Sequence, residues 1–162
     1  MIREVRISDA QQLCDIYNYY IKHTVITFEE ELLQAEDMIT RIRDISAKYT
    51  WIVYEENDEI IGYAYASKWR ERSAYRFVVE TTVYLKNGKQ GKGIGTVLYA
   101  ELIELLKIKG FRVLLGCVTL PNETSVKLHE NFGFVKVAHF PVVGHKFNQW
   151  LDVGFWQLVL SD

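Results

Sequence analysis

The sequence is poor in proline and cysteine, with two of each among 162 residues. So little proline argues against collagen-like or linker-rich chains, and two cysteines are too few for the disulfide framework of a small secreted domain. Cys14 and Cys117 have neither CxxC spacing nor a histidine nearby. We therefore expect two buried thiols and no metal site.

The chain also lacks a long apolar run and a strong charge of either sign. No stretch approaches the roughly 18 apolar residues of a membrane-spanning helix, and the first ten residues do not resemble a signal peptide. The 19 Lys and Arg and 21 Asp and Glu give a formal net charge of -2, which leaves no basic surface for a phosphate backbone. We expect a cytoplasmic protein that binds neither membrane nor nucleic acid.

Apolar residues, in contrast, are plentiful and evenly spread. They make up 49% of the chain, and aromatic residues make up 14%. A chain of this length and composition buries enough surface to form a core with a cleft, and no linker or repeat interrupts it. We expect a single domain over residues 1–162.

Apolar residues spaced three and four apart predict four helices. Ser8 followed by Gln11 has the spacing of a capping box and should begin the first helix. Gly110 stands where the third helix should end. The predicted helices cover residues 8–22, 33–48, 94–110 and 122–132.

Alternating and continuous apolar runs predict the strands. Residues 111–118 form a continuous apolar run after a strand and a helix, which implies a parallel neighbour reached by a right-handed crossover. The other predicted strands are residues 2–7, a hairpin over 51–69, residues 75–85, and two antiparallel strands from 133 around a loop at 144–149. The fold class is therefore α/β with a mixed sheet.

A glycine-rich segment, Gln90–Gly95, separates a predicted strand from a predicted helix. Glycines let successive N–H groups converge, and the helix N-terminus adds a positive dipole end, so the segment is suited to a phosphate. A Walker loop would need Gly-Lys-Ser or Gly-Lys-Thr at the end of its six-residue frame, whereas here the frame Gly88–Gly93 is followed by Ile94. A dinucleotide fingerprint would need GxGxxG and an acidic residue after the next strand, and neither is present.

A second segment, Asn122–Phe134, follows about thirty residues later. Its Asn122, Ser125 and His129 lie close to one face of a helix. Together, the two segments resemble the cofactor motifs of the GCN5-related N-acetyltransferases (GNAT), whose co-substrate is acetyl-CoA. The residues that this resemblance implies in binding it are Gln90, Gly91, Lys92, Gly93, Ile94, Gly95, Thr96, Asn122 and Ser125. An N-cap role for Asn122 and a core role for His129 remain structural alternatives.

The resemblance extends over nearly the whole chain to the phosphinothricin N-acetyltransferases. It implies a GNAT fold: a largely antiparallel, mixed sheet of six to seven strands flanked by helices, with a parallel pair splayed at the acetyl-CoA site. It also implies a homodimer that acetylates the α-amino group of phosphinothricin, methionine sulfoximine or methionine sulfone. The segments that carry it are residues 16–20, 27–28, 69–72, 75–85, 120–130 and 150–157.

The same resemblance implies Glu80 as general base and His129 as a residue beside the reacting centre. An α-amino group, with a reference pKa of about 8, must lose a proton before it attacks a thioester. Glu80 shares its side of the strand with Val78, Thr82 and Tyr84, a partly apolar setting that should raise its pKa. Many relatives have tyrosine at the His129 position as a proton donor, and His129 as donor or as relay stays open.

The remaining site residues are also implied by the resemblance. The backbone of Val83, Tyr84 and Leu85 should bind the pantetheine arm. Arginine suits bidentate binding of oxyanions, so Arg70 and Arg72 are the leading candidates for the acceptor's anionic groups. The other residues implied near the acceptor are Phe28, Tyr75 and Lys146.

The last hairpin departs from the family pattern at His145 and Asn148, near the expected mouth of the acceptor site. The identity of the acceptor therefore stays open. One alternative is acetylation of another amine, such as a polyamine, a peptide N-terminus or an aminoglycoside. A second is a module that binds acyl-CoA without turnover.

Overall fold

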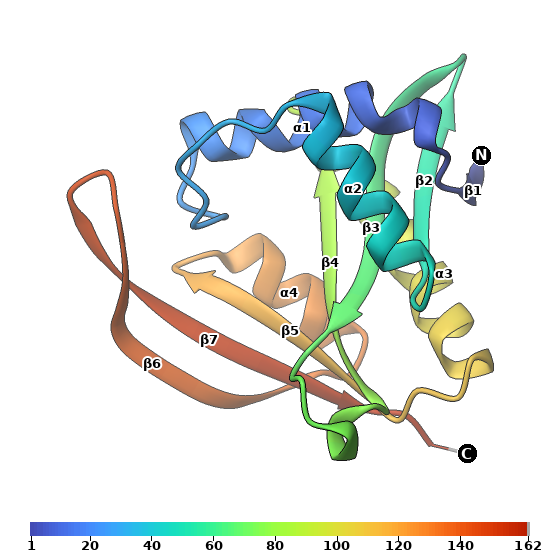
Figure 1. Ribbon diagram of the computed structural model, residues 1–162. Coiled ribbons are helices and arrows are strands. Elements are labelled where there is room, and N and C mark those ends of the chain that lie inside the picture. The colour runs from blue at the N-terminus through green and yellow to red at the C-terminus, as the bar shows by residue number, and fades with distance from the viewer. Residues whose placement is uncertain (162) are drawn as a thin grey trace.

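A seven-stranded sheet organises the chain, with the strand order β1-β2-β3-β4-β5-β7-β6 (Figure 1). The structure is a computed structural model, and it describes residues 1–161. Neighbouring strands are antiparallel except β4 and β5, which are parallel. The strands are β1 (Ile2–Glu4), β2 (Trp51–Glu56), β3 (Glu59–Lys68), β4 (Val78–Leu85), β5 (Val113–Leu120), β6 (Val135–Lys146) and β7 (Gln149–Val159).

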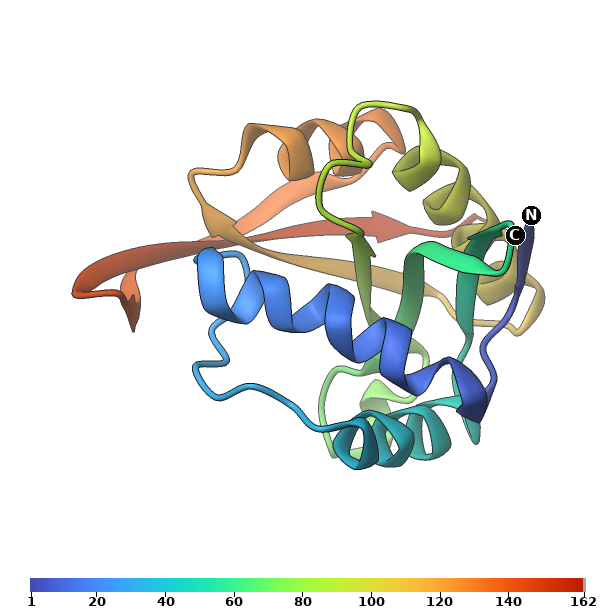
Figure 2. The same cartoon turned by 90° about the horizontal axis from the view of Figure 1, so that it is seen from above.

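Helices cover both faces of the sheet (Figure 2). On one face, α1 and α2 bury an apolar cluster that includes Leu13, Ile42 and Tyr63. On the other, α3 buries Leu98 and Leu102 in a second cluster, and α4 lies over β5. The helices are α1 (Ala10–His23), α2 (Ala35–Ser46), α3 (Ile94–Ile108) and α4 (Glu123–Asn131).

The mixed sheet, its parallel pair and the four helices confirm the predicted fold class, but the first helix begins differently. A 3-10 turn over Ile7–Asp9 ends the first strand early and leads into α1. The Asp9 carboxylate accepts a hydrogen bond from the Arg6 N–H at 2.7 Å and pairs with the guanidinium of Arg3 at 2.8 Å. The prediction that Ser8 caps this helix is therefore wrong, because Ser8 lies inside the 3-10 turn and the N-cap position of α1 is Asp9, which makes no side-chain capping bond to the helix.

Two predicted boundaries also move. The strand predicted to begin at residue 75 begins at Val78, because Ser73–Tyr75 form a short 3-10 turn. The loop predicted over 144–149 shrinks to Phe147 and Asn148, whose positive φ angles of 50° and 56° make a two-residue hairpin turn. The strand β6 therefore extends through Lys146, into the segment that was predicted to be a loop.

The parallel pair opens after three residues. The strands β4 and β5 are paired from Val78↔Val113 to Glu80↔Leu115, and beyond that point they diverge. Figure 1 shows β5 turning away from β4 toward the β6–β7 hairpin. The edge of β4 beyond Glu80 is therefore free of a strand partner on this side, and the opening lies between the two helical layers.

Candidate active site

A cleft of about 310 Å³ occupies the opening between β4 and β5. Strands, three helices and the loop between α1 and α2 all contribute to it, so residues distant in sequence meet there. The lining residues are Tyr17, Ile26, Thr27, Phe28, Tyr65, Glu80, Thr81, Thr82, Val83, Tyr84, Tyr99, Cys117, Val118, Thr119, Asn122, Ser125, His129 and Val153.

Glu80 lies at the last paired position of β4, where the cleft begins. Within residues 1–161, its carboxylate has no hydrogen-bond donor and no ion-pair partner, and burial raises its pKa above the ordinary value of 4.5. No cation stabilises the ionised form of this carboxylate. Its oxygen atoms can therefore accept a proton from a bound molecule.

His129 lies on α4 and is only 5% exposed. Its Nδ1 lies 2.7 Å from the carbonyl oxygen of Ser125, and because a carbonyl can only accept, Nδ1 carries the proton. Burial lowers the pKa of His129. The ring is therefore neutral at pH 7, with Nε2 as an acceptor directed at Gly116 of β5, where a built Cβ would collide with it.

The glycine-rich segment forms an open turn before α3. Gly91 and Gly93 have left-handed φ angles of 77° and 79°, and a Cβ at either would meet no protein atom within 4 Å. The first-turn N–H groups of α3, at Ile94, Gly95 and Thr96, have no intrahelical partners. An open backbone surface at a helix N-terminus fits the diphosphate of acetyl-CoA.

Side chains hold this segment in place. The Tyr20 hydroxyl donates to the carbonyl oxygen of Leu85 at 2.5 Å and accepts from Nε2 of Gln90 at 3.1 Å. Oε1 of Gln90 in turn accepts from the N–H of Gly88 at 2.9 Å. The end of β4 and the glycine turn are thus tied to the same residue of α1.

Asn122 caps α4 and also lines the cleft. Its Oδ1 accepts from the N–H of Ser125 at 3.1 Å. The N-cap role is therefore present in the structure.

The model of the acetyltransferase (GNAT) domain family matches residues 2–154. The chain belongs to the GNAT acetyltransferases. It is 35% identical over 156 residues to the phosphinothricin N-acetyltransferase of Streptomyces viridochromogenes. The aligned residues cover 96% of this chain and 85% of the relative. It is 32% identical to the methionine sulfoximine/methionine sulfone acetyltransferase of Salmonella typhimurium, over 99% of this chain and 95% of the relative.

A solved GNAT structure has the same fold. The phosphinothricin acetyltransferase of Sinorhizobium meliloti in complex with acetyl-CoA superposes with a TM-score of 0.96 at 34% identity, over 99% of this chain and 88% of that one. The resemblance to phosphinothricin acetyltransferases is thereby confirmed. This GNAT chain is an acetyl-CoA-dependent N-acetyltransferase.

Further features of the chain bear on other expectations. Among the helices of residues 1–161, none combines the length and hydropathy needed to cross a bilayer. In the same part of the chain, no three His, Cys, Asp or Glu side chains come close enough to hold a metal ion. Metal independence and a cytoplasmic location stay predictions.

The expectation of two buried thiols is confirmed for Cys14 and wrong for Cys117, which is exposed to the cleft of this acetyltransferase. The strand β5 loses its neighbour β4 beyond Leu115, so the next side chain on that face is left uncovered. Desolvation in the cleft, followed by the charge of Glu80, raises the pKa of the Cys117 thiol to about 12. The thiol is therefore protonated and adds a small apolar surface beside Glu80.

The five residues predicted to bind the acceptor lie in three places. Phe28 lines the cleft. The guanidinium of Arg70 lies over the ring of Trp69 at 4.6 Å, and Tyr75 packs on the same ring at 5.2 Å, so both belong to the loop before β4. In a single chain, neither they nor Arg72 line the cleft. Lys146 lies behind the cleft wall and is 1% exposed.

Sequence reasoning missed Thr81, Tyr99 and Thr119 as lining residues. The hydroxyl groups of Thr81 and Tyr99 lie 2.6 Å apart, and that of Thr81 also donates to the carbonyl oxygen of Leu115 at 3.2 Å, which closes the paired end of the opening. The only available signal was that Thr81 lies next to Glu80. Position 99 falls within the helix predicted over 94–110, and the helical pattern gave no sign that this position would line a cleft.

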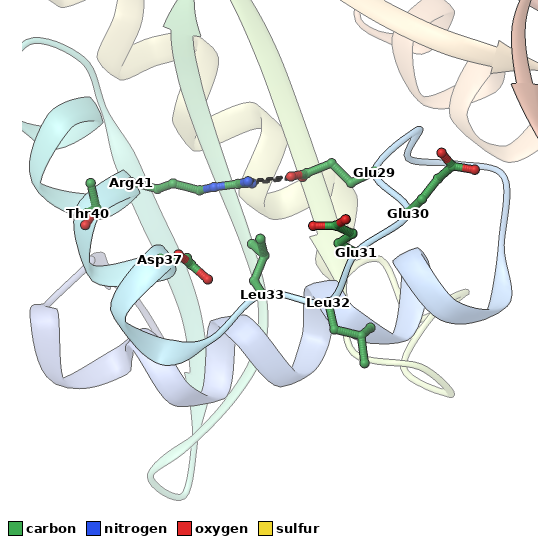
Figure 3. Close-up of a pocket in the computed structure, with 8 residues that line it drawn as sticks. All are labelled: Glu29, Glu30, Glu31, Leu32, Leu33, Asp37, Thr40 and Arg41. Atoms are coloured by element: carbon green, nitrogen blue, oxygen red, sulfur yellow. Dashed lines mark hydrogen bonds and ion pairs between the residues drawn. The ribbon is translucent and has the colours of Figure 1, made fainter.

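A second cavity, of about 650 Å³, lies between the α1–α2 loop and α2 (Figure 3). Arg41 extends across it and forms a bidentate ion pair with Glu29, with one N–O distance of 2.9 Å. The carboxylate of Glu29 also accepts from the Tyr17 hydroxyl, which lines the cleft. The α1–α2 loop therefore separates the two cavities, and its Glu29 connects the second cavity to a residue that lines the cleft.

Proposed function

We propose that this acetyltransferase acetylates the α-amino group of a small amino-acid-like acceptor, of the phosphinothricin, methionine sulfoximine or methionine sulfone type, with Glu80 as general base. Its similarity to a phosphinothricin N-acetyltransferase and to a methionine sulfoximine/methionine sulfone acetyltransferase supports the acceptor class. The observation that carries the mechanism is a carboxylate in the cleft that has a raised pKa and, among residues 1–161, no hydrogen-bond donor.

In this proposal, acetyl-CoA supplies the acetyl group and the chain provides the binding surfaces and proton acceptors. Residues 90–96 bind the diphosphate through backbone N–H groups. The free edge of β4 at Val83–Leu85 binds the pantetheine arm. Asn122 and Ser125 line the same side of the opening. These assignments are supported by the open turn, the divergence of β4 from β5, and the lining of the cleft.

Glu80 accepts the proton of the acceptor's ammonium group, and the neutral amine nitrogen then becomes the nucleophile. A raised pKa improves a carboxylate as a base for an ammonium group, provided that the carboxylate is still ionised at the working pH. His129 has its proton fixed on Nδ1, so its free Nε2 favours a role as proton acceptor or relay over that of donor.

The lining of the cleft bears on the alternative acceptors. Of the lining residues, Glu80 is the one carboxylate. A polyamine or an aminoglycoside carries several positive charges and needs several carboxylates for its recognition, whereas a single α-ammonium group needs one. The cleft therefore favours a monoamine acceptor.

A screen of CoA release tests this function. The acceptors are amino acids, their sulfone, sulfoximine and phosphinate analogues, spermidine, an aminoglycoside and a short peptide, each with acetyl-CoA and a thiol reagent. We expect the highest kcat/KM for the amino-acid analogues. Preference for a polyamine would favour the first alternative. Tight acetyl-CoA binding without CoA release from any acceptor would favour the non-catalytic module.

We also propose a homodimer formed through β6, an edge strand of the sheet. Exposed apolar side chains on and beside it support this, because an open edge with such a surface is a template for association. They are Val135, Val137, Phe140, Val142, Val143 and Trp150. Light scattering after gel filtration should give twice the chain mass, and Val142→Lys should yield a monomer.

A further inference from the structure

Lys146 has an unusual environment for a lysine. It is 1% exposed and lies at the end of β6, and its Nζ donates to the carbonyl oxygen of Thr27 at 2.8 Å. The Phe147 ring lies 5.0 Å from this nitrogen. Buried lysines are rare unless a partner holds them. The ammonium group is therefore committed to the backbone of the α1–α2 loop and does not reach the cleft.

The neighbouring position on the same face of β6 contacts the next residue of that loop. Gly144 is two residues before Lys146, so both face the loop. The ring of Phe28 occupies the space that a Cβ at Gly144 would fill. Thr27 and Phe28 both line the cleft. Two consecutive wall residues are thus fastened to the hairpin, one by a hydrogen bond and one by packing.

The loop is fastened from the opposite side as well. Glu29 pairs with Arg41 of α2, as Figure 3 shows, and Oγ1 of Thr27 lies 2.8 Å from the Tyr17 hydroxyl of α1. The hydroxyl group of Thr119, on β5, adds a long contact of 3.5 Å to the carbonyl oxygen of Ile26. Lys146 therefore supplies the one charged contact between the hairpin and this wall within residues 1–161.

We propose that Lys146 is a positioning residue, which holds Thr27 and Phe28 as the acceptor-side wall of the cleft, and that it does not bind the acceptor's anionic groups. This inference rests on the proposed acceptor site. It replaces the direct role implied by the resemblance, because a buried ammonium group bonded to a main-chain carbonyl offers no surface to a ligand.

Lys146→Met tests the proposal, since methionine keeps the apolar stem and removes the ammonium group. We expect the acceptor KM to rise by about 10- to 150-fold, the range for losing a charged hydrogen bond, while the acetyl-CoA KM stays unchanged. The matched control is Lys136→Met, an exposed lysine of the same strand. Gly144→Ala, which displaces Phe28 without touching Lys146, should give the same pattern.

Two further measurements separate positioning from direct binding. An amino-acid acceptor and the corresponding amine without its carboxylate should lose the same factor in Lys146→Met, and Phe28→Ala combined with Lys146→Met should be no worse than the more damaged single variant. A loss confined to the carboxylate-bearing acceptor, multiplicative losses, or an unchanged KM would each overturn the proposal.

Hydrogen exchange of residues 24–31 supplies a readout that does not depend on turnover. Lys146→Met should speed exchange there, and Lys136→Met should not. If the wild-type chain fails to release CoA with every acceptor, the proposed function falls, whereas unchanged exchange in Lys146→Met overturns the positioning role by itself.

Discussion

Glu80 and His129 lie on opposite faces of the sheet, one on each side of the opening between β4 and β5. Glu80 shares its strand face with Tyr84, whose ring packs against Tyr17 and Tyr20 of α1. His129 packs on Tyr99 of α3 at 5.3 Å. Both line one cleft, so the carboxylate proposed as the base and a neutral imidazole face the same opening from two sides.

Glu80→Gln should lower kcat by about 10²- to 10⁴-fold, because the amide keeps the shape of the side chain and cannot accept the ammonium proton. Binding of acetyl-CoA should persist, and the co-substrate should still raise the melting temperature. Glu101→Gln, on the exposed side of α3, is the matched control and should be fully active. Normal turnover in Glu80→Gln would remove this residue from the mechanism.

Glu80→Gln should also stabilise the fold at neutral pH. Burial raises the folded-state pKa of Glu80 above 4.5, so the native state binds the proton more tightly than the unfolded state, and stability falls as pH rises through this range. The amide removes that cost. Urea unfolding at pH 8 should therefore give a higher free energy of unfolding for the variant, with the gain vanishing near the unfolded-state pKa. A variant less stable than the wild type at pH 8 would contradict this.

Gly93→Val should abolish the thermal shift produced by acetyl-CoA. A β-branched residue is strained at a φ of 79°, and its side chain would enter the open space that the diphosphate needs. Gly88→Val is the control, because its φ of 83° imposes similar strain before the binding turn. Calorimetry with acetyl-CoA should show binding in the control alone. Full affinity in Gly93→Val would show that the co-substrate binds elsewhere.

Gly116→Ala should damage both stability and turnover. The added Cβ would collide with the His129 ring, and overpacking of this kind costs about 1–3 kcal/mol. Thermal unfolding should show a lower melting temperature, and the double variant Gly116→Ala with His129→Ala should recover part of it because the ring is gone. Gly95→Ala, whose Cβ would lie 3.6 Å from Leu85, is the stability control. An unchanged melting temperature in Gly116→Ala would disprove the contact.

Tyr20→Phe should weaken acetyl-CoA binding by about 3- to 10-fold, the effect of losing hydrogen bonds that fix the end of β4 and the glycine turn. The acceptor KM should stay the same, because the ring itself still packs on Tyr84. Tyr19→Phe is the matched control, since this hydroxyl makes no hydrogen bond within residues 1–161. Initial rates with each substrate varied in turn measure the split, and equal effects on both substrates would contradict it.

Several parts of the fold and site follow from local sequence. Apolar residues three and four apart predict the helices, and glycines next to a helix start predict the turn before α3. The side of β4 that carries Glu80 follows from the two-residue period of a strand. These features depend on neighbours within about ten residues, so the sequence by itself was sufficient to place them and to reveal the resemblance to the acetyltransferases.

The tertiary structure alone decided what covers each side chain. Lys146 and Arg72 were both predicted from sequence to lie near the acceptor. In the structure, however, Lys146 is buried behind the cleft wall and Arg72 lies in an outer loop. Cys117 lies in an apolar run but is uncovered where β4 turns away. Burial is set by contacts between segments far apart in the chain, such as Lys146 with Thr27, and no local pattern encodes those contacts.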